Sequence, residues 1–490
     1  MRMRLRIGPL WSSNICQPAD AATSGAVRLN VAVDPAPPTN SPRVREVCWQ
    51  FGITPHAAAI RLAGDVSLPL RPGQITLVTG PSGSGKSITL RYLARQLNRR
   101  AIWVDWQHFH PTRPIIDQVA PHASLAEAAS TLTACGLGEP RLWLRRITDL
   151  SDGEQFRARL ARAVSLAQQQ PGSVLLVDEF CALLHRRLAR AMSYCLRKTI
   201  TRQALCMVAA TTRDDLSADL QPDQTLRLDA DEPALVTAQT APRRPSFWRR
   251  LHIESGKLRD YKDFDAMHYR RRAGLGPISR IFVLRDGIAG QALGIVVYGY
   301  PSLSLHLRNL VTDGAYKQSG QRLNRDFRIL RRLVIHPDVR GCGLAHWLVS
   351  QTLPQVGTRY VECLAAMGAV NPVFERAGMI RLGTVRLPRC RQQLHDSLAG
   401  LGIDPLSADF GRRVSRQQNL RRLVGQTVHK WLQATTGRPI ERIRSLGPDK
   451  LAAAFVQLMG AAPIYYLWST DPAERSRLHC EAGRLALQEP

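Results

Sequence analysis

The sequence predicts an α/β multidomain protein, and three observations lead to this prediction. The chain has 490 residues, which is too long for a single hydrophobic core. Short β-branched runs such as Ile75–Thr79 and Val174–Asp178 alternate with amphipathic helical stretches, as in a sheet with helical crossovers. Proline-rich stretches at 34–42 and 231–250 interrupt this alternation. We therefore divide the chain at these stretches and treat its parts in order.

Residues 1–45 are expected to form a flexible basic extension, because the stretch 34–42 is rich in proline and small polar residues. The first six residues are basic, but Gly8 and Pro9 interrupt the apolar core that a signal peptide needs. No later stretch is apolar enough over a sufficient length to span a bilayer. We therefore expect a cytoplasmic chain with no membrane partner.

The next part, residues 46–230, contains a predicted phosphate-binding loop. The loop fits the pattern G-x-x-x-x-G-K-[ST] and lies between the strand Ile75–Thr79 and a helix. Its residues are Gly80, Pro81, Ser82, Gly83, Ser84, Gly85, Lys86 and Ser87. In such a loop backbone N–H groups surround the phosphates, Lys86 neutralises the outer ones, and Ser87 offers its hydroxyl to Mg²⁺. ATP and Mg²⁺ are therefore the expected ligands.

A pair of acidic residues, Asp178 and Glu179, lies at the end of the predicted strand Val174–Asp178. Asp178 is expected to hold Mg²⁺, and Glu179 to polarise the water that attacks the γ-phosphate. The alternative is that the pair only caps an ordinary helix. Its combination with the upstream loop favours the catalytic interpretation.

The stretch Leu150–Gln155 reads LSDGEQ. With the loop and the acidic pair, it resembles the ABC ATPase family, whose signature is LSGGQ, and the resemblance covers roughly 47–229. In that family the signature caps the γ-phosphate of ATP held by the opposite subunit. The resemblance thus assigns that role to Ser151 and Gly153, and it implies a head-to-tail homodimer. Gln107 corresponds to the glutamine of the family's Q-loop.

Thr212 marks a departure from the family, because it occupies the position of the switch histidine. We therefore expect slow hydrolysis. The distance in sequence from Ser87 to Ser151 is too short for long coiled-coil arms, so a compact cassette is expected.

The part at 251–390, which follows the linker at 231–250, contains a second glycine turn. A strand ends at His336-Pro337, and Arg340-Gly341-Cys342-Gly343 precede a helix. Such a turn directs backbone N–H groups outward at a helix N-terminus, which suits a pyrophosphate. Together with the stretch 371–379, the turn resembles GNAT acetyltransferases, which bind acyl-CoA there. The resemblance assigns acetyl-CoA, or another acyl-CoA, to Val334, Ile335, Arg340, Gly341, Cys342, Gly343, Leu344, Ala345 and Asn371.

Glu362, on the strand after this helix, is the candidate general base for acyl transfer. The alternative is a structural ion pair with one of the many arginines. Many members of the GNAT family carry a tyrosine where this chain has Phe374, which leaves the catalytic acid unassigned.

Residues 391–490 are predicted to form a helical, basic C-terminal region, in which Leu420, Val424 and Val428 share one helix face. The expected fold class is thus an ABC-type P-loop ATPase domain, a GNAT-fold α+β domain and this region. That order resembles a group of ABC-type ATPases fused to a predicted acetyltransferase. Its second part resembles, more loosely and over 268–378, the Mom-type DNA-modification proteins of phages.

The charge balance favours a polyanionic partner. The chain has 67 Lys and Arg against 39 Asp and Glu, a formal net charge of +28. A merely solvated basic surface is the alternative. Three functions remain open: acyl transfer to a nucleic-acid base, acyl transfer to a protein lysine or small amine, and a DNA-binding ATPase switch with a degenerate GNAT module. The ten cysteines contain no CxxC pair and predict neither a zinc site nor a disulfide framework.

Overall fold

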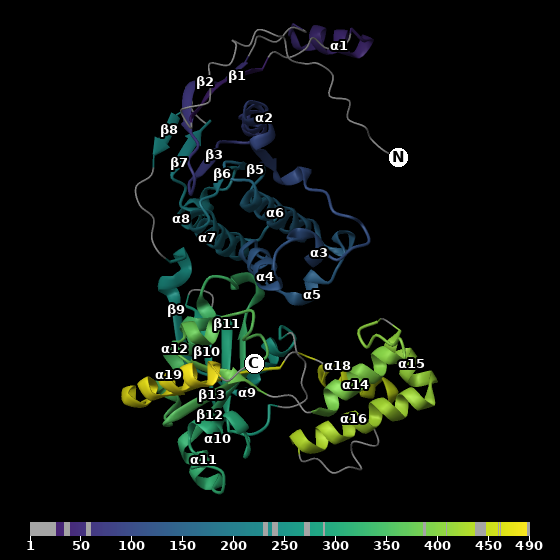
Figure 1. The fold of residues 1–490 in the computed structure, drawn as a ribbon. Coiled ribbons are helices and arrows are strands. Elements are labelled where there is room, and N and C mark those ends of the chain that lie inside the picture. The colour runs from purple at the N-terminus through teal and green to yellow at the C-terminus, as the bar shows by residue number, and fades with distance from the viewer. Residues whose placement is uncertain are drawn as a thin grey trace.

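The computed structural model describes residues 26–33, 40–54, 60–228, 234–237, 244–268, 275–287, 290–385, 389–407, 409–436, 447–458, 460 and 462–487. Two sheets with their helices lie one above the other in Figure 1, and a bundle of helices lies beside the lower sheet. We call residues 26–237 the first half and residues 244–487 the second half. Within the described ranges, no helix has both the length and the apolar composition needed to cross a membrane.

The first half is built on a six-stranded sheet with the strand order β4-β5-β6-β3-β7-β8. Its strands are β3 (Ile75–Thr79), β4 (Ala101–Trp103), β5 (Val174–Val177), β6 (Cys206–Thr211), β7 (Gln224–Arg227) and β8 (Ala234–Thr237). All pairs are parallel except β7–β8. The central strands are continuous apolar runs because helices cover both of their faces.

Two hydrophobic clusters fill the space between this sheet and its helices. One cluster lies toward α2 (Lys86–Leu97) and includes Leu90 and Leu93. The other, on the opposite face, lies toward α6 (Asp152–Gln169) and α7 (Arg186–Arg202). Four shorter helices complete this half: α3 (Ile116–Val119), α4 (Leu125–Ala134), α5 (Pro140–Trp143) and α8 (Ser217–Leu220).

An N-terminal hairpin packs on α2, which differs from the flexible extension expected at 1–45. Strand β1 (Ala26–Val33) pairs antiparallel with β2 (Ile60–Pro69), and the short helix α1 (Pro42–Phe51) lies between them in sequence. Leu29 and Val31 point to the same side of β1 and are buried in the α2 cluster. The described structure of this half therefore begins at residue 26, while 1–25 lie outside the described residues.

The second half contains a seven-stranded sheet with the order β14-β15-β13-β12-β11-β10-β9. Its strands are β9 (Leu251–Ser255), β10 (Ile278–Asp286), β11 (Gln291–Gly299), β12 (Phe327–Ile335), β13 (Tyr360–Ala365), β14 (Ile380–Thr384) and β15 (Ile464–Ser469). Only β12 and β13 are parallel neighbours, and they pair only from Phe327 to Leu330 on β12. Beyond Leu330, β12 continues its pairing with β11 alone, so β12 and β13 part toward their carboxyl ends.

Helices cover both faces of this second sheet. α12 (Leu344–Thr352) and α13 (Val373–Arg376) enclose one apolar cluster with Val296, Leu330 and Val361. The other face carries α9 (Leu258–Asp265), α10 (His306–Val311), α11 (Gly320–Asp326) and α19 (Pro472–Ala486).

The helical bundle is an insertion between β14 and β15. It consists of α14 (Arg389–Gly400), α15 (Phe410–Arg416), α16 (Gln418–Thr436) and α18 (Pro448–Leu458), and it has its own hydrophobic cluster. Leu420, Val424 and Val428 are buried in that cluster, as their spacing predicts.

The chain then returns to the sheet, where β15 lies between β13 and β14. This differs from the division at residue 390, which assigned 391–490 to a separate helical region. The run Ile464-Tyr-Tyr-Leu-Trp-Ser469 is buried at every position, as a strand covered on both faces requires.

Candidate functional site

The predicted nucleotide-binding residues meet at the carboxyl edge of the first sheet. Strands β3 and β5 both pair in parallel with β6, so the segments that follow these three strands lie at the same edge. The phosphate-binding loop follows β3, and Asp178 and Glu179 follow β5. The structure therefore brings together two motifs that lie about 90 residues apart in sequence.

The loop from Gly80 to Ser87 has the geometry of an anion cradle. At Gly80, whose φ is +150°, a Cβ atom would lie 2.6 Å from Ser84 Oγ. Gly85 adopts φ +89° as the N-cap of α2, so the first N–H groups of that helix face the loop. The Ser84 hydroxyl is buried and has no hydrogen-bond partner among the described residues. An orphaned buried hydroxyl inside a glycine loop fits a phosphate ligand.

Lys86 lies across the loop, where its Nζ donates to Gly80 O at 2.7 Å and to Pro81 O at 2.6 Å. Burial lowers the pKa of Lys86, and the Asp178 carboxylate acts in the opposite direction. The ammonium group is thus close to both the loop and the predicted metal ligand.

The acidic pair is held in a strained turn directly after β5. Glu179 has φ +47°, and its backbone N–H donates to Asp178 Oδ1 at 3.0 Å. The Phe180 N–H donates to Ala210 O at 2.7 Å, which ties the turn to the end of β6. The Glu179 side chain is exposed, so it is accessible to water at the edge of the sheet.

Arg213 was not singled out in the sequence, yet it joins the segment after β6 to the loop after Glu179. Its guanidinium donates to Cys181 O at 3.1 Å and to Leu184 O at 2.6 Å. It also forms an ion pair with Asp215 at 3.1 Å. Thr212, beside it, is exposed at the position of the family's switch histidine. A lone arginine in a chain with 67 basic residues gives no sequence signal of this role.

The remaining predicted ATP-binding residues have local partners. The Gln107 side chain, after β4, donates to Trp103 O at 3.0 Å. Ser151 is the N-cap of α6 and forms a capping box with Glu154, whose carboxylate lies 2.9 Å from Ser151 N. Gly153 lies in the first turn of α6, where a Cβ atom would approach Leu184 to 3.2 Å. Ser151 is exposed at this helix start.

Comparison with known proteins agrees with this geometry. The family described as "AAA ATPase domain" matches residues 65–193. The Fe(3+) ions import ATP-binding protein FbpC 1 of Rhizobium meliloti is 29% identical over 201 residues, which are 35% of this chain and 54% of that protein. The zinc import ATP-binding protein ZnuC of Cereibacter sphaeroides is 31% identical over 148 residues, 26% of this chain and 58% of that protein. The first half is an ATP-binding ATPase domain of the P-loop class, similar to ABC-type ATPases.

These matches concern the ATPase domain alone. The chain spans little more than half the length of the two import proteins. A solved dimeric structure of MJ0796, a bacterial ABC transporter cassette, aligns with a TM-score of 0.31 and 19% identity, over 37% of this chain and 93% of that chain.

The glycine turn of the second half follows β12 and starts α12. Gly341 and Gly343 both have φ +86°, a conformation that favours glycine. Among the described residues, no backbone N–H from Gly341 to His346 donates to a backbone carbonyl. These N–H groups fit an anionic group such as a pyrophosphate.

The side chains of the same turn face the ATPase domain. Arg340 donates to Ile335 O at 2.9 Å, to Gly138 O at 2.8 Å and to Met267 O at 3.0 Å. Cys342 is buried with its Sγ 3.7 Å from Cys195 Sγ of α7. The side chains of Arg340 and Cys342 are therefore occupied by contacts within the protein, so only the backbone of the turn has groups left for a ligand.

The other residues assigned to acyl-CoA lie around this turn. Val334 and Ile335 are buried at the end of β12, and Leu344 is buried at the start of α12. Ala345 is half-buried in α12, and Asn371 is exposed before α13.

Glu362, the candidate base, lies in a buried ion pair. Its carboxylate is 3.0 Å from Arg308 Nη1, and both side chains are almost completely inaccessible to water. Tyr465 Oη donates to the same carboxylate at 3.0 Å. Burial raises the pKa of Glu362, whereas Arg308 and Tyr465 act in the opposite direction. This geometry favours the structural ion pair that was the alternative interpretation, because the carboxylate is buried and already paired with Arg308 and Tyr465.

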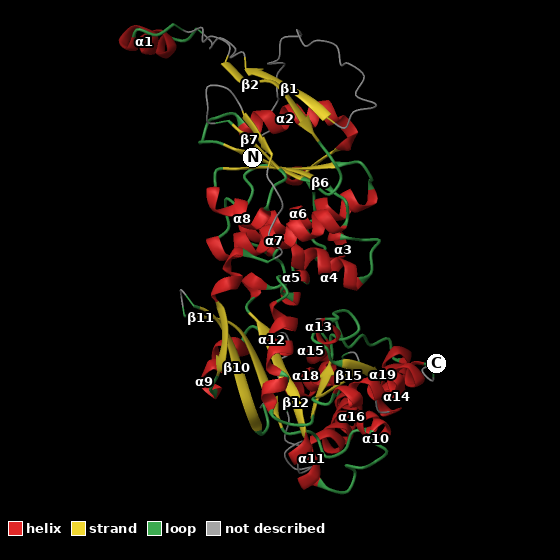
Figure 2. Ribbon diagram, turned by 90° about the vertical axis from the view of Figure 1, so that its left-hand side faces the viewer, coloured by secondary structure: helices red, strands yellow, loops and turns green. Residues whose placement is uncertain are grey.

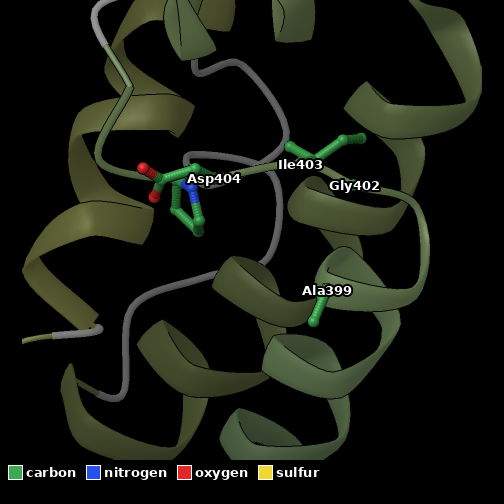
Figure 3. A pocket seen from close by; sticks show the side chains of 5 residues that line it. Ala399, Gly402, Ile403 and Asp404 are labelled. Carbon is green, nitrogen blue, oxygen red and sulfur yellow. The ribbon is translucent and has the colours of Figure 1, made fainter.

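Neither of two further features adds a site. A cavity of about 330 Å³ is lined by Ala399, Gly402, Ile403, Asp404 and Pro405 of the helical insertion, and none of the predicted site residues lines it (Figure 3). Throughout the described ranges, no group of three or more His, Cys, Asp or Glu side chains has the arrangement of a metal site.

Proposed function

We propose that this protein is an ATP-regulated, acyl-CoA-dependent acyltransferase that acts on nucleic acid. The observation that carries the transferase part is the segment β12–glycine turn–α12–β13. It combines N–H groups at a helix N-terminus, which have no backbone partner among the described residues, with two parallel strands that part beside them. The N–H groups suit a pyrophosphate, and in this proposal the chain attached to it would lie beside the diverging strands.

In the ATPase domain, the phosphate-binding loop and the acidic pair have separate roles. The loop N–H groups and Lys86 bind the phosphates, while Ser87 and Asp178 hold Mg²⁺. Glu179 orients the attacking water. A partner subunit contributes Ser151 and Gly153 in a head-to-tail homodimer. Thr212 cannot exchange a proton as histidine does, so turnover is slow.

The second half would use acyl-CoA, which supplies an activated thioester. The turn from Gly341 to Ala345 binds its pyrophosphate and orients it relative to β12 and β13. Since Glu362 is held by Arg308, we assign no general base. An acceptor amine that is largely neutral at pH 7, such as the exocyclic amine of a nucleobase, needs less help from a base than a lysine does.

The nucleic-acid part rests on charge and its position. The segment from Phe410 to Thr436 contains no acidic residue, and five of its arginines lie within eleven positions. They belong to the end of α15 and the start of α16: Arg412, Arg413, Arg416, Arg421 and Arg422. No ion pair of these five occurs within the described part of the chain. Such a surface attracts phosphates.

Mass spectrometry of nucleosides tests this function. Purified protein is incubated with acetyl-CoA, ATP and either bulk DNA or tRNA, and the nucleic acid is digested to nucleosides. A nucleoside that gains the acyl mass supports the proposal. Acylated lysine in a protein substrate, with unchanged nucleosides, would instead support transfer to a protein lysine or small amine.

A second candidate is an ATPase switch that binds DNA through a non-catalytic GNAT-like module. The burial of Glu362 with Arg308 favours this candidate, because the one predicted base is unavailable. Calorimetry with acetyl-CoA distinguishes the two candidate functions. A non-catalytic module that does not bind acetyl-CoA gives no heat of binding, whereas an acyltransferase does. A cytoplasmic location is part of both proposals.

A further inference from the structure

The two halves share one hydrophobic cluster at the glycine turn. Ala191, Tyr194 and Cys195 of α7 pack with Val339 and Cys342 of the second half. Helices α4, α5 and α7 lie between the two sheets in both views (Figures 1 and 2). We call the contact between α7 and residues 338–342 the joint.

Polar contacts surround this shared cluster. Asp338 forms an ion pair with Arg187 of α7 and lies 3.3 Å from Nε2 of His185, the N-cap of α7. It also lies 3.2 Å from His336. Burial would raise the pKa of Asp338, but hydrogen bonds from His336 and Arg187 outweigh burial and hold it well below its usual range. Asp338 is therefore ionised at neutral pH and fixes the start of α7 to the turn.

The same end of α7 is tied to the ATP site. Arg186 and Arg190 lie 3.2 and 3.6 Å from Asp215. Asp215 in turn binds Arg213, whose guanidinium holds the carbonyl groups of Cys181 and Leu184. Cys181 comes two residues after Glu179. A continuous set of contacts thus runs from the acidic pair to the joint.

We propose that the joint couples the ATP site to the glycine turn, so that the nucleotide bound in the ATPase domain changes the conformation of residues 340–343. This inference rests on the proposed function, because it assigns to ATP the control of acyl-CoA binding. We treat three residues as positioning residues, because they hold the glycine turn in place and do not themselves contact acyl-CoA: Asp338, Arg340 and Cys342. Coupling between two sites is reciprocal, so ATP changes acyl-CoA affinity by the same factor as acyl-CoA changes ATP affinity.

The first experiment measures how fast a disulfide forms across the joint, with no acyl-CoA present. Cys195 and Cys342 are both buried, and their sulfur atoms lie 3.7 Å apart. Diamide accepts two electrons and two protons from the thiols, which form a disulfide across the joint. The trapping rate, followed by peptide mass spectrometry, is expected to differ at least about fivefold between protein with and without a non-hydrolysable ATP analogue. The variant Cys195→Ser controls for other cysteines. Equal rates would overturn the proposal.

The second experiment measures acetyl-CoA affinity by calorimetry, with and without the same analogue. The ratio of the two affinities is expected to be about 5 to 150 in the wild type. Arg187→Gln removes the Arg187–Asp338 ion pair, leaving the His185 contact in place, and should reduce the ratio toward one. The matched control Arg202→Gln changes an exposed arginine at the far end of α7 and should keep it.

The two failures are distinguishable. If the protein binds both acetyl-CoA and the ATP analogue, but the analogue does not change the affinity for acetyl-CoA, the coupling is contradicted. The proposal of acyl transfer is then unaffected. If the trapping rate depends on nucleotide but the protein does not bind acetyl-CoA, the response of the joint to nucleotide is supported. The proposal of acyl transfer is then contradicted.

Discussion

Arg308 and Glu362 form a charged pair with almost no access to water. Arg308 also donates to the backbone of Ser302 and Leu303 at 2.6 and 3.0 Å, and Tyr465 completes the carboxylate's partners. Such a pair is tolerated because each charge has several partners. The fold loses stability when one of the two charges is removed, because the other then stays buried without its partner.

The variant Glu362→Gln is therefore expected to lower the free energy of unfolding by about 3 to 5 kcal/mol, since Arg308 then remains uncompensated. Chemical denaturation followed by circular dichroism measures this change. The control Glu254→Gln alters the partly exposed pair with Arg285 and should cost about 0 to 1 kcal/mol. A stable Glu362→Gln protein that loses only transferase activity would instead support a role as general base.

At the ATP site, Lys86 is a second charged side chain that is held by partners within the protein. Its ammonium donates to two carbonyl groups of its own loop, and a phosphate offers it a charged acceptor instead. We expect Lys86→Ala to weaken ATP binding by about 10- to 100-fold, the loss of one charge-assisted hydrogen bond. Fluorescent ATP titration measures the affinity. Arg91→Ala, at an exposed position of the same helix, should bind ATP as the wild type does; if both variants behave alike, the assignment of Lys86 is wrong.

At the scale of elements, the parts of the fold that follow from local patterns were predictable. The strands β3 and β5, the loop from Gly80 to Ser87 and the buried face of α16 all have the periodicity or motif expected of them. β15 was missed because its neighbours in the sheet, β13 and β14, precede it by about 80 residues or more, and no local pattern reports such pairing. β1 was missed because proline-rich residues follow it directly.

The candidate site of the second half shows the same limit. The glycine turn was predicted from its motif, and the structure has a turn there with Gly341 and Gly343 at φ +86°, while its ligand stays a prediction. The side chains of Arg340 and Cys342 were assigned to a ligand, yet their neighbours are Gly138 and Cys195 from a distant stretch of sequence. Single cysteines and arginines give no signal of such tertiary partners.

Helices α15 and α16 allow a direct test of nucleic-acid binding. Reversing charge in Arg416→Glu, Arg421→Glu and Arg422→Glu together should weaken binding to DNA or RNA by at least about tenfold at low salt. It should also reduce the slope of log affinity against log salt by about 3 for DNA. Fluorescence anisotropy with duplex DNA and with RNA, over a range of salt, provides both values.

The control for this surface is the triple change Arg91→Glu, Arg99→Glu and Arg113→Glu, which reverses the same amount of charge at exposed positions of the ATPase domain. Equal losses in both triple variants would show that net charge alone governs binding and would remove the assignment to α15 and α16.

At the scale of the whole molecule, the proposed dimer depends on ATP that is bound but not hydrolysed. Glu179→Gln keeps the size of the side chain and removes the carboxylate that is proposed to polarise water. With ATP and Mg²⁺ this variant should elute as a dimer in size-exclusion chromatography, and the added change Ser151→Arg should return it to a monomer. A Glu179→Gln protein that stays monomeric under saturating ATP would contradict the head-to-tail arrangement.

The connection between β14 and β15 makes the helical insertion separable. Thr384 pairs with Ile464, so the ends of the two strands are adjacent. Replacing residues 386–462 with a short glycine–serine turn is expected to leave the sheet folded, whereas a chain that stops at residue 460 should lose the fold of the second half. Proteolysis and circular dichroism compare the two variants. If the shortened chain with the turn also unfolds, the insertion is required for the sheet.

The position of β15 also affects how the protein is made. During synthesis, β13 is complete about 100 residues before β15 leaves the ribosome, which corresponds to about 5 to 20 seconds. Throughout that interval the edge of β13 has unpaired N–H and C=O groups that attract other strands. The ATPase domain is already complete and presents Ala191, Tyr194 and Cys195 of α7. In the folded protein this apolar surface packs against Val339 and Cys342, so a folded partner for the second half exists before β15 is made.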